Sequence, residues 1–216
     1  MAACLAFHSG FRLEFLTSRL VFTTITACGC GAVFANLSIP HSNRKGLTMA
    51  RSVTLKGNPL DLEGPELKVG DKAPDAVLRK DLVTDVKMSE TSGKVRVVSV
   101  VPSLDTPVCA LQTKRFNEEM STLPNVEFIT VSTDLPVAQS RFCGAEKLDT
   151  SRFRCFSDHK EVDFGKKYGT LIPALRIECR AVFVVDASDT LKYVEYVKEV
   201  AEHPNYDAVL ACAKSL

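Results

Sequence analysis

The sequence predicts a three-layer α/β fold, in which helices flank a central mixed sheet and a β-hairpin comes first. Short runs rich in β-branched residues alternate along the chain with amphipathic segments of helical period. The alternation ends in two strand-like runs joined by a short turn, followed by one more helical segment. Alternating strands and helices build a sheet covered by helices, and hairpins add antiparallel strands to it.

The strands of this prediction are short. VTLKGNPLDLEG (53–64) has the pattern of a hairpin that turns around Asn58-Pro59. KVRVVSVVP (94–102) is dense enough in valine to form a buried strand. VEFITVSTD (126–134) has the same character, so we expect a second buried strand beside the first.

A helix is expected after each of these two strands. The first runs from about Pro107 to Leu123, and the second is a short helix at LPVAQSRFCGAE (135–146). The apolar residues of the first lie roughly along one face, which we expect to be buried. These are Val108, Leu111, Phe116, Met120 and Leu123.

Two further helices have recognisable ends. SDHKEVDFGKKYG (157–169) begins with a capping box from Asp158 to Glu161 and stops at Gly169. The last helix starts at Asn205. Its inward-facing residues are expected to be Tyr206, Val209, Leu210, Ala213 and Leu216.

A closing hairpin completes the pattern. RAVFVVD (180–186) and LKYVEYV (191–197) are expected to pair across the turn 187–190. Strand, helix, strand, helix, then a hairpin and a helix is the order of a thioredoxin-like α/β fold.

The composition excludes several classes of protein. Lys and Arg number 27 and Asp and Glu 26, so no overall charge indicates a nucleic-acid partner. Eight cysteines in 216 residues fall far below the density of a disulfide-stapled scaffold. We find no C-x-x-C, no H-E-x-x-H and no paired Cys/His clusters, so a structural zinc site is not expected.

Residues 1–48 differ from the remainder, and we expect an N-terminal extension there and one domain at 49–216. The extension holds four basic residues and one acidic residue, and its uncharged run from Leu20 to Asn43 is too polar for a spanning helix. A signal peptide, an organelle transit peptide, a disordered tail and an over-called start before Met49 all fit this pattern. The last two place the protein in the cytoplasm, and a true targeting segment would place it in the periplasm, outside the cell or in an organelle.

SLDTPVC (103–109) places a single cysteine at the start of a helix. Thr106 is a good N-cap, Pro107 a good first residue, and Cys109 is therefore the third residue of the helix. There its sulfur lies over unpaired backbone N–H groups and the positive end of the helix dipole, which favours a thiolate. The Thr106 hydroxyl can bond the sulfur or a substrate oxygen. Because position 106 holds an alcohol in place of a second thiol, we expect attack by one sulfur. The alternative is a small buried residue near a helix start.

These residues carry a resemblance. SLDTPVC, followed by DLPVAQSRFCGAE and CRAVFVVD, closely resembles the bacterial thiol peroxidase family, the atypical two-cysteine peroxiredoxins. The similarity extends from about residue 51 to the C-terminus. The two cysteine motifs are long and stand in the family's order.

The resemblance implies a role for each matching residue. Cys109 would be the peroxidatic cysteine, which attacks the O–O bond and becomes a sulfenic acid. Thr106 would orient the peroxide, Arg180 would hold the thiolate and polarise the departing oxygen, and Pro102 would shield the sulfur. Without the family match, Arg180 would be a surface ion-pair residue and Pro102 a strand terminator.

Cys143 matches the resolving cysteine, which would form an intrachain disulfide with Cys109. It lies in the last turn of its helix, just before Gly144, where fraying costs least. Two sulfurs on separate helices seldom start close enough to bond, so we expect local unwinding at both sites in each cycle. The alternative is an inward-facing cysteine at a helix end.

The remaining cysteines receive no catalytic role. Cys155 is expected on a strand, in the core of the protein. Cys179 is expected close to the active pocket, and Cys212 at the margin of the last helix's apolar face. His159 is expected to be exposed in the first turn of its helix and is not required as a base.

The implied function is reduction of hydrogen peroxide and organic hydroperoxides to water and alcohols, with thioredoxin reopening the disulfide. No metal, flavin, haem or other cofactor is expected, because sulfur does the two-electron chemistry. The resemblance also implies a homodimer, and neither membrane nor nucleic acid is an expected partner. Two alternatives are a general thiol–disulfide oxidoreductase, against which the missing C-x-x-C counts, and a non-catalytic redox or metal-binding module that uses Cys28-Gly-Cys30.

Overall fold

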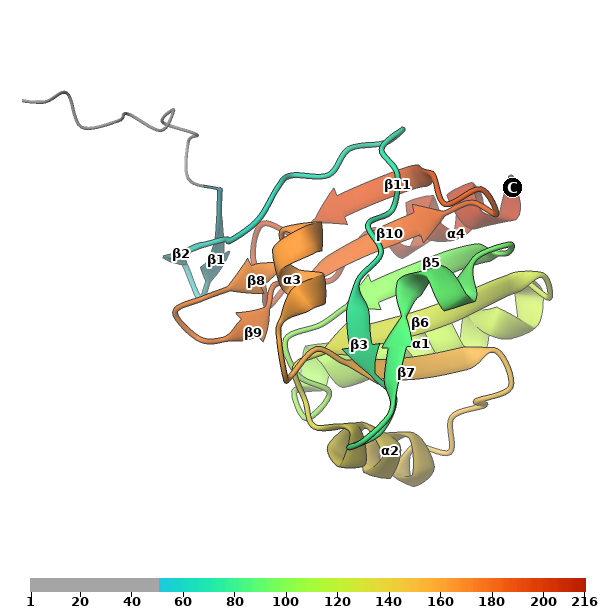
Figure 1. Ribbon diagram of the computed structural model, residues 1–216, viewed down its shortest axis with the longest axis horizontal. Coiled ribbons are helices and arrows are strands. Elements are labelled where there is room, and N and C mark those ends of the chain that lie inside the picture. The colour runs from blue at the N-terminus through green and yellow to red at the C-terminus, as the bar shows by residue number, and fades with distance from the viewer. Residues whose placement is uncertain (1–50) are drawn as a thin grey trace, which may run out of the picture. The chain divides into compact units, whose positions relative to one another are not determined.

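The computed structural model describes residues 51–216 (Figure 1). The strands are β1 (Ser52–Leu55), β2 (Asn58–Asp61), β3 (Val77–Arg79), β4 (Asp85–Lys87), β5 (Val95–Val100), β6 (Val126–Ser132), β7 (Phe153–Ser157), β8 (Leu171–Ile172), β9 (Ile177–Glu178), β10 (Ala181–Val185) and β11 (Leu191–Tyr196). The α-helices are α1 (Pro107–Glu119), α2 (Pro136–Ala145), α3 (Asp163–Tyr168) and α4 (Tyr206–Lys214), with short 3₁₀ helices η1 (Met88–Thr91) and η2 (Met120–Thr122).

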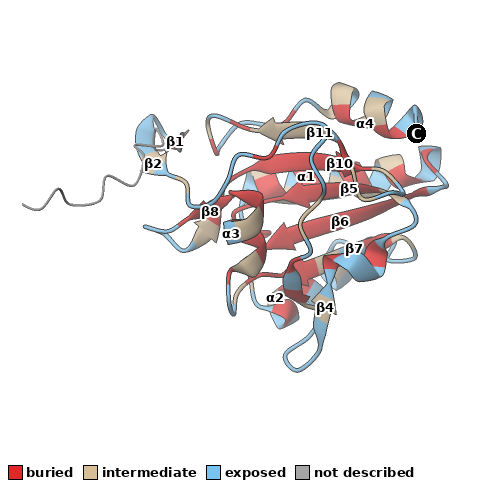
Figure 2. Cartoon of the chain, turned by 45° about the horizontal axis from the view of Figure 1, so that its top comes forward, coloured by how far each residue is buried: buried red, intermediate tan, exposed pale blue. Residues whose placement is uncertain are grey.

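The centre of the fold is a mixed sheet with strand order β11-β10-β5-β6-β7-β3-β4. β5, β6 and β7 are parallel, and the strands on either side of this group are antiparallel to their neighbours. All seven residues of β6 are buried, and Figure 2 shows the neighbouring central strands buried as well. The predicted buried strands and closing hairpin are confirmed.

Helices cover both faces of the sheet. Valine and phenylalanine side chains of one face pack against α1 and α4, and those of the other face pack against α3, η1 and the N-terminal segment. In Figure 1, α3 lies in front of the sheet, with α1 and α4 behind it. Because alternate strand residues point to opposite faces, the valine-rich strands supply both cores at once. The predicted three-layer fold is confirmed.

The N-terminal hairpin forms, but its turn is at Lys56-Gly57 and not at Asn58-Pro59. Both turn residues have positive φ, +51° and +77°. A two-residue hairpin turn of this type requires φ above zero at both positions, which glycine adopts freely. Asn58 and Pro59 therefore belong to β2, where they pair with Leu55 and Thr54.

The capping box predicted at Asp158 and Glu161 is wrong. α3 begins five residues later than Asp158, at Asp163. The Asp158 carboxylate still caps this helix, because it accepts backbone N–H bonds from Phe164 at 3.1 Å and Gly165 at 2.8 Å. The helix ends at Gly169 in the left-handed conformation, with φ of +64°, as predicted.

Two predicted inward-facing residues are exposed. Leu111 on α1 is 56% exposed and Leu216 is 50% exposed. α1 instead buries Gln112 and Thr113 beside Cys109 and Phe116. The helix presents a polar side chain to the interior because Gln112 has buried partners there, and hydrophobicity alone could not indicate this. Asn205, where the last helix is expected to start, is the N-cap of α4 and accepts the Ala208 N–H at 3.1 Å.

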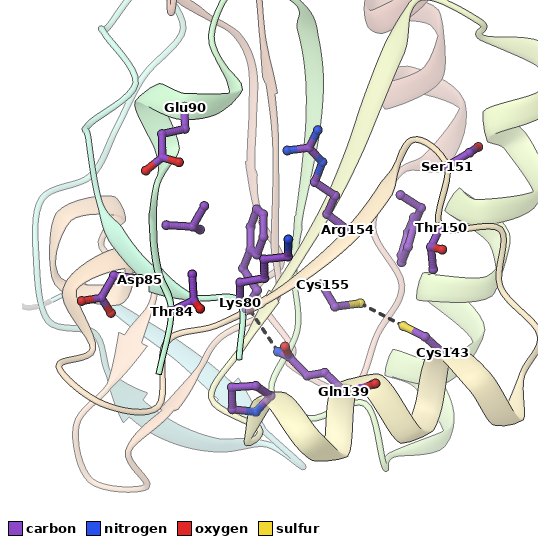
Figure 3. A pocket seen from close by; sticks show the side chains of 15 residues that line it. Lys80, Thr84, Asp85, Glu90, Gln139, Cys143, Thr150, Ser151, Arg154 and Cys155 are labelled. Atoms are coloured by element: carbon purple, nitrogen blue, oxygen red, sulfur yellow. Dashed lines mark hydrogen bonds between the residues drawn. The ribbon is translucent and has the colours of Figure 1, made fainter. Parts of the chain in front are cut away.

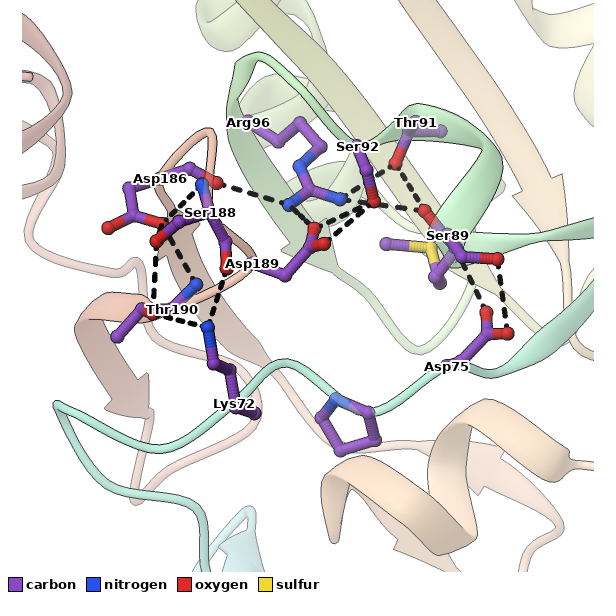
Figure 4. A network of polar contacts seen from close by, with 12 residues as sticks. Lys72, Asp75, Ser89, Thr91, Ser92, Arg96, Asp186, Ser188, Asp189 and Thr190 are labelled. Carbon is purple, nitrogen blue, oxygen red and sulfur yellow. Dashed lines mark hydrogen bonds and ion pairs between the residues drawn. The ribbon is translucent and has the colours of Figure 1, made fainter.

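A buried arginine fixes the start of β5, the strand that leads to the candidate site. Arg96 donates to Thr91 of η1 at 3.1 Å and to the Asp186 carbonyl at 3.2 Å, and it forms an ion pair with Asp189 (Figure 4). Ser92 donates to the same Asp189 carboxylate at 2.8 Å. This network joins η1 to the turn between β10 and β11.

Candidate active site

The loop from β5 to α1 is attached to the end of β6. The Asp134 carboxylate accepts the Ser103 hydroxyl at 2.7 Å and the Leu104 backbone N–H at 2.7 Å. It also accepts the Ser132 hydroxyl at 2.8 Å. The sequence shows that Asp134 directly follows a buried strand. It does not show that the partners of this carboxylate are Ser103 and Leu104. Asp134 thus fixes the direction in which the chain enters α1.

Thr106, Pro107 and Cys109 occupy the N-cap, first and third positions of α1, as predicted. The Thr106 hydroxyl makes no capping bond to the helix, because it donates to the Ser103 carbonyl at 3.0 Å. Its oxygen keeps lone pairs to accept a further bond. Cys109 is fully buried, at 0% exposure.

Arg180 meets the Cys109 sulfur. It directly precedes β10, is 1% exposed, and donates from Nη2 to Cys109 Sγ at 3.3 Å. Its Nε donates to the Val200 carbonyl at 2.9 Å. Its Nη1 donates to Gln112 Oε1 at 2.6 Å. Three partners, two on α1 and one at Val200, hold the guanidinium in one orientation, which suits the planar fork of arginine.

Gln112 is a site residue that sequence reasoning missed. It is fully buried, and its amide Nε2 donates to the Ser99 hydroxyl of β5 at 2.8 Å while its Oε1 receives Arg180. It follows Cys109 by three positions, so both side chains lie on the same side of α1. That spacing was the available signal. It carried no weight because Leu111 was assigned to the buried face.

The positive charge of Arg180 meets no carboxylate within the described part of the chain. Among residues 51–216 its hydrogen bonds go to a carbonyl, an amide oxygen and a sulfur, and to no carboxylate. A buried cation without a counter-ion is costly. Of these three partners, only the Cys109 sulfur is a group that can carry a negative charge.

Cys143 lies in the last turn of α2 and joins the same apolar cluster as Cys109. Val101, Leu104 and Phe142 form that cluster with Cys109, and Cys143 packs against it. The sulfur of Cys143 is 3.5 Å from that of Cys155 on β7 (Figure 3). The Cys155 S–H beside it lowers the pKa of Cys143, and this same hydrogen bond, together with burial, raises the pKa of Cys155.

Comparison with known proteins identifies the family. Residues 68–210 match the redoxin family. The thiol peroxidase of Oceanobacillus iheyensis is 51% identical over 160 residues, which cover 74% of this chain and 96% of that protein. The thiol peroxidase of Bacillus subtilis is 44% identical over 164 residues, covering 76% and 97%. A peroxiredoxin-like protein from Aquifex aeolicus superimposes with a TM-score of 0.71 at 45% identity, covering 77% and 97%.

The chain belongs to the thiol peroxidases of the redoxin family. The expected family and fold are therefore confirmed. The chain is an enzyme of the peroxiredoxin type, which reduces peroxides at the expense of thiols.

The other residues singled out in the sequence lie around this site or apart from it. Pro102 is buried two residues after β5. Cys179 is fully buried beside Arg180 in sequence, and burial raises the pKa of its thiol. Cys212 is half-buried on α4, as expected, and burial raises the pKa of its thiol too. Cys28 and Cys30 lie outside the described residues.

His159 is not in the first turn of a helix, since α3 starts at Asp163. Its side chain is half-buried, with Nδ1 2.9 Å from the Ser157 hydroxyl. Burial, with the nearby cations Arg79 and Arg176, lowers the pKa of His159.

In the part of the chain that the structure describes, no three His, Cys, Asp or Glu side chains are grouped to hold a metal ion. Over the same residues, no helix combines the length and the apolar character needed to cross a membrane.

Proposed function

We propose that the enzyme reduces hydrogen peroxide and organic hydroperoxides through Cys109. The supporting observation is the buried Arg180 guanidinium, which lies 3.3 Å from the Cys109 sulfur and lacks a carboxylate partner among residues 51–216. A sulfur that is kept as thiolate is a strong nucleophile, and a fixed cation beside it stabilises charge that develops on the peroxide.

The proposed first step is an attack by the Cys109 thiolate on one peroxide oxygen. The S–O bond forms as the O–O bond breaks, Cys109 becomes a sulfenic acid, and the departing oxygen takes a proton to leave as water or an alcohol. Arg180 donates to the oxygen that gains charge. The Thr106 hydroxyl orients the peroxide, and Pro102 limits the access of water to the sulfur.

In the second step, Cys143 condenses with the sulfenic acid and releases water, which leaves a Cys109–Cys143 disulfide. Cys109 is fully buried in α1 and Cys143 lies on a different helix. The first turn of α1 and the last turn of α2 therefore unwind locally to bring the sulfurs into bonding distance. Thioredoxin reopens this disulfide by thiol–disulfide exchange.

We further propose a homodimer, supported by large apolar side chains exposed on the two cysteine helices and just before α2. Leu111, Leu135 and Val137 are 56%, 49% and 54% exposed. Sedimentation velocity tests this proposal, and Val137→Asp should shift a dimer toward monomer.

We assign catalysis to residues 49–216 and place the enzyme in the cytoplasm. In support of this range, the match to the redoxin family covers residues 68–210. The mass of the native N-terminus tests whether residues 1–48 remain in the mature protein.

The central experiment is Cys109→Ser in a coupled assay with thioredoxin and a hydroperoxide. This variant should lose peroxide turnover, because serine is not ionised at neutral pH. Cys212→Ser, which removes a half-buried thiol on α4, should keep the wild-type rate. Retention of most of the rate in Cys109→Ser would refute the assignment.

A second variant tests the resolving step. Cys143→Ser should consume one equivalent of peroxide and then stop with thioredoxin as donor, because the sulfenic acid has lost its partner. Sustained cycling at the wild-type rate would show that another thiol resolves the intermediate.

A further inference from the structure

Cys155 was expected to be a core residue without a redox role, but its sulfur contacts that of Cys143. The two sulfurs are 3.5 Å apart, and a disulfide bond is about 2.05 Å long, so they need approach by only about 1.5 Å to bond. Figure 3 shows the two side chains, from α2 and β7, pointing toward one another. Both also pack against the apolar cluster that contains Cys109.

The pair is open to solvent on one side. A surface pocket of about 700 Å³ is lined by both cysteines, together with Gln139, Ser151 and Arg154 (Figure 3). Cys109, by contrast, is fully buried under Arg180. A disulfide between Cys143 and Cys155 would therefore face an external reductant without movement of α1.

The order in which the two thiols react follows from their shared proton. The hydrogen bond between the two sulfurs lowers the pKa of Cys143 and raises that of Cys155. Cys143 therefore ionises before Cys155 and is the first nucleophile of the pair. Once Cys143 is in a disulfide, its negative charge no longer opposes ionisation of Cys155, and the proton can leave through the pocket.

We propose that Cys155 is a third redox residue, which takes over the disulfide from Cys109 and leaves a Cys143–Cys155 bond at the pocket. This inference rests on the proposed function, because it needs the Cys109–Cys143 disulfide as its starting point.

The step is a thiol–disulfide exchange and needs no added oxidant. The Cys155 thiolate attacks the Cys143 sulfur, the S–S bond to Cys109 breaks, and Cys109 leaves as a thiolate. The Cys155 sulfur is oxidised and the Cys109 sulfur is reduced. The departing thiolate regains its contact with Arg180, and both cysteine helices return to the folded arrangement, which favours this direction.

The exchange predicts a distinctive stoichiometry. With Cys109 free again, the oxidised enzyme can react with a second peroxide before any reductant acts, and this second sulfenic acid has no resolving thiol. Without reductant, wild-type enzyme should therefore consume about two equivalents of peroxide, and Cys155→Ser about one.

The experiment treats the full chain with two equivalents of hydrogen peroxide, traps sulfenic acid with dimedone, and maps disulfides under non-reducing conditions. Wild type should give Cys143–Cys155 with dimedone on Cys109, and Cys155→Ser should give Cys109–Cys143 with no label. Cys212→Ser is the matched control and should behave as wild type. Cys155→Ala repeats the test without a hydroxyl, and circular dichroism confirms that each variant is folded.

The outcomes separate the two proposals. If wild type yields Cys109–Cys143 and consumes one equivalent, as Cys155→Ser does, the exchange is wrong and the proposed function stands. A disulfide from Cys143 to any cysteine other than Cys109 or Cys155 also overturns the exchange. Wild-type peroxide consumption by Cys109→Ser overturns the proposed function itself.

Discussion

At the scale of residues, the site depends on one buried cation and the groups that orient it. Arg180 bonds Val200, Gln112 and Cys109 from three different nitrogens. Lysine carries the same charge on one nitrogen and cannot reproduce this fork. One of the three bonds reaches the Cys109 sulfur. The other two orient the guanidinium, so they determine how it meets that sulfur.

Arg180→Lys should slow the reaction with peroxide by about tenfold to hundredfold, since a hydrogen bond to a charged group contributes roughly 1.5–3 kcal/mol. Stopped-flow oxidation of the enzyme measures this rate. Arg152→Lys is the control, because Arg152 is half-buried and bonds three carbonyls elsewhere, those of Met120, Leu123 and Val126. An equal loss of rate in both variants would mean that Arg180 acts only through stability.

Gln112→Glu should slow peroxide reduction at neutral pH by about tenfold, because a new carboxylate competes with the thiolate for Arg180. The rise of the rate with pH should also move to higher pH. Gln112→Met has similar size and no charge, so it should leave the position of that rise unchanged. Identical pH profiles for the two variants would contradict the electrostatic role.

At the scale of elements, two helix ends bear on the proposed movement of Cys143 and on the stability of the fold. Cys143 and Gly144 lie in the last turn of α2. Gly169, which has a φ of +64°, ends α3 on the face of the sheet opposite to α1. These two glycines have opposite effects, one easing unwinding and the other permitting a turn.

Gly144→Ala should stabilise the fold by about 0.5–1 kcal/mol and slow disulfide formation after peroxide by about two- to fivefold. A Cβ at Gly144 meets no atom within 4 Å, so alanine adds helix propensity without a clash. Quenched-flow trapping of the disulfide measures the effect. Ser140→Ala, earlier in α2, should change the rate less. Faster resolution in Gly144→Ala would argue against unwinding of this turn.

Gly169→Ala should lower the free energy of unfolding by more than about 1 kcal/mol. Its Cβ would overlap the Pro65 carbonyl oxygen, in a conformation that alanine rarely adopts. Urea unfolding measures the loss, with Gly144→Ala as the substitution of opposite sign. Unchanged stability would show that the segment at Pro65 shifts freely.

At the scale of the whole molecule, the N-terminal hairpin supports the active site from a distance. Thr54 of β1 exchanges backbone bonds with Lys198 and Val200, at 2.7 and 2.8 Å. The Val200 carbonyl in turn accepts Arg180 at 2.9 Å. The Glu199 carboxylate between them accepts the Thr54 hydroxyl at 2.8 Å and the Gly57 N–H at 3.2 Å.

These bonds predict a pH dependence. The Thr54 hydroxyl and the backbone N–H of Gly57 lower the pKa of Glu199 from 4.5 to about 2. A carboxyl group whose pKa is lower in the folded than in the unfolded protein stabilises the fold at pH values above the unfolded pKa. This stabilisation is lost as the pH falls toward the folded pKa. Glu199→Gln should therefore be less stable than wild type at neutral pH, and the difference should vanish between about pH 5 and 2. Thermal unfolding measures it, with Glu202→Gln as control. A constant difference across this range would exclude the carboxylate as its cause.

The sequence by itself determined the order of the elements and the place of Cys109 at the start of a helix. Valine-rich runs predict buried strands without knowledge of the rest of the fold. Thr106-Pro107 predicts the start of a helix from local geometry, and this makes Cys109 the third residue of that helix. These signals are local, and each is carried by residues that are neighbours in the chain.

The tertiary structure alone decided what surrounds that sulfur. Arg180 reaches Cys109 across 71 residues, and Gln112 is buried because it has one partner on β5 and another just before β10. Cys155 meets Cys143 because α2 packs on β7. No local pattern distinguishes a buried arginine from a surface one, because burial and pairing are set by which segments the sheet brings together.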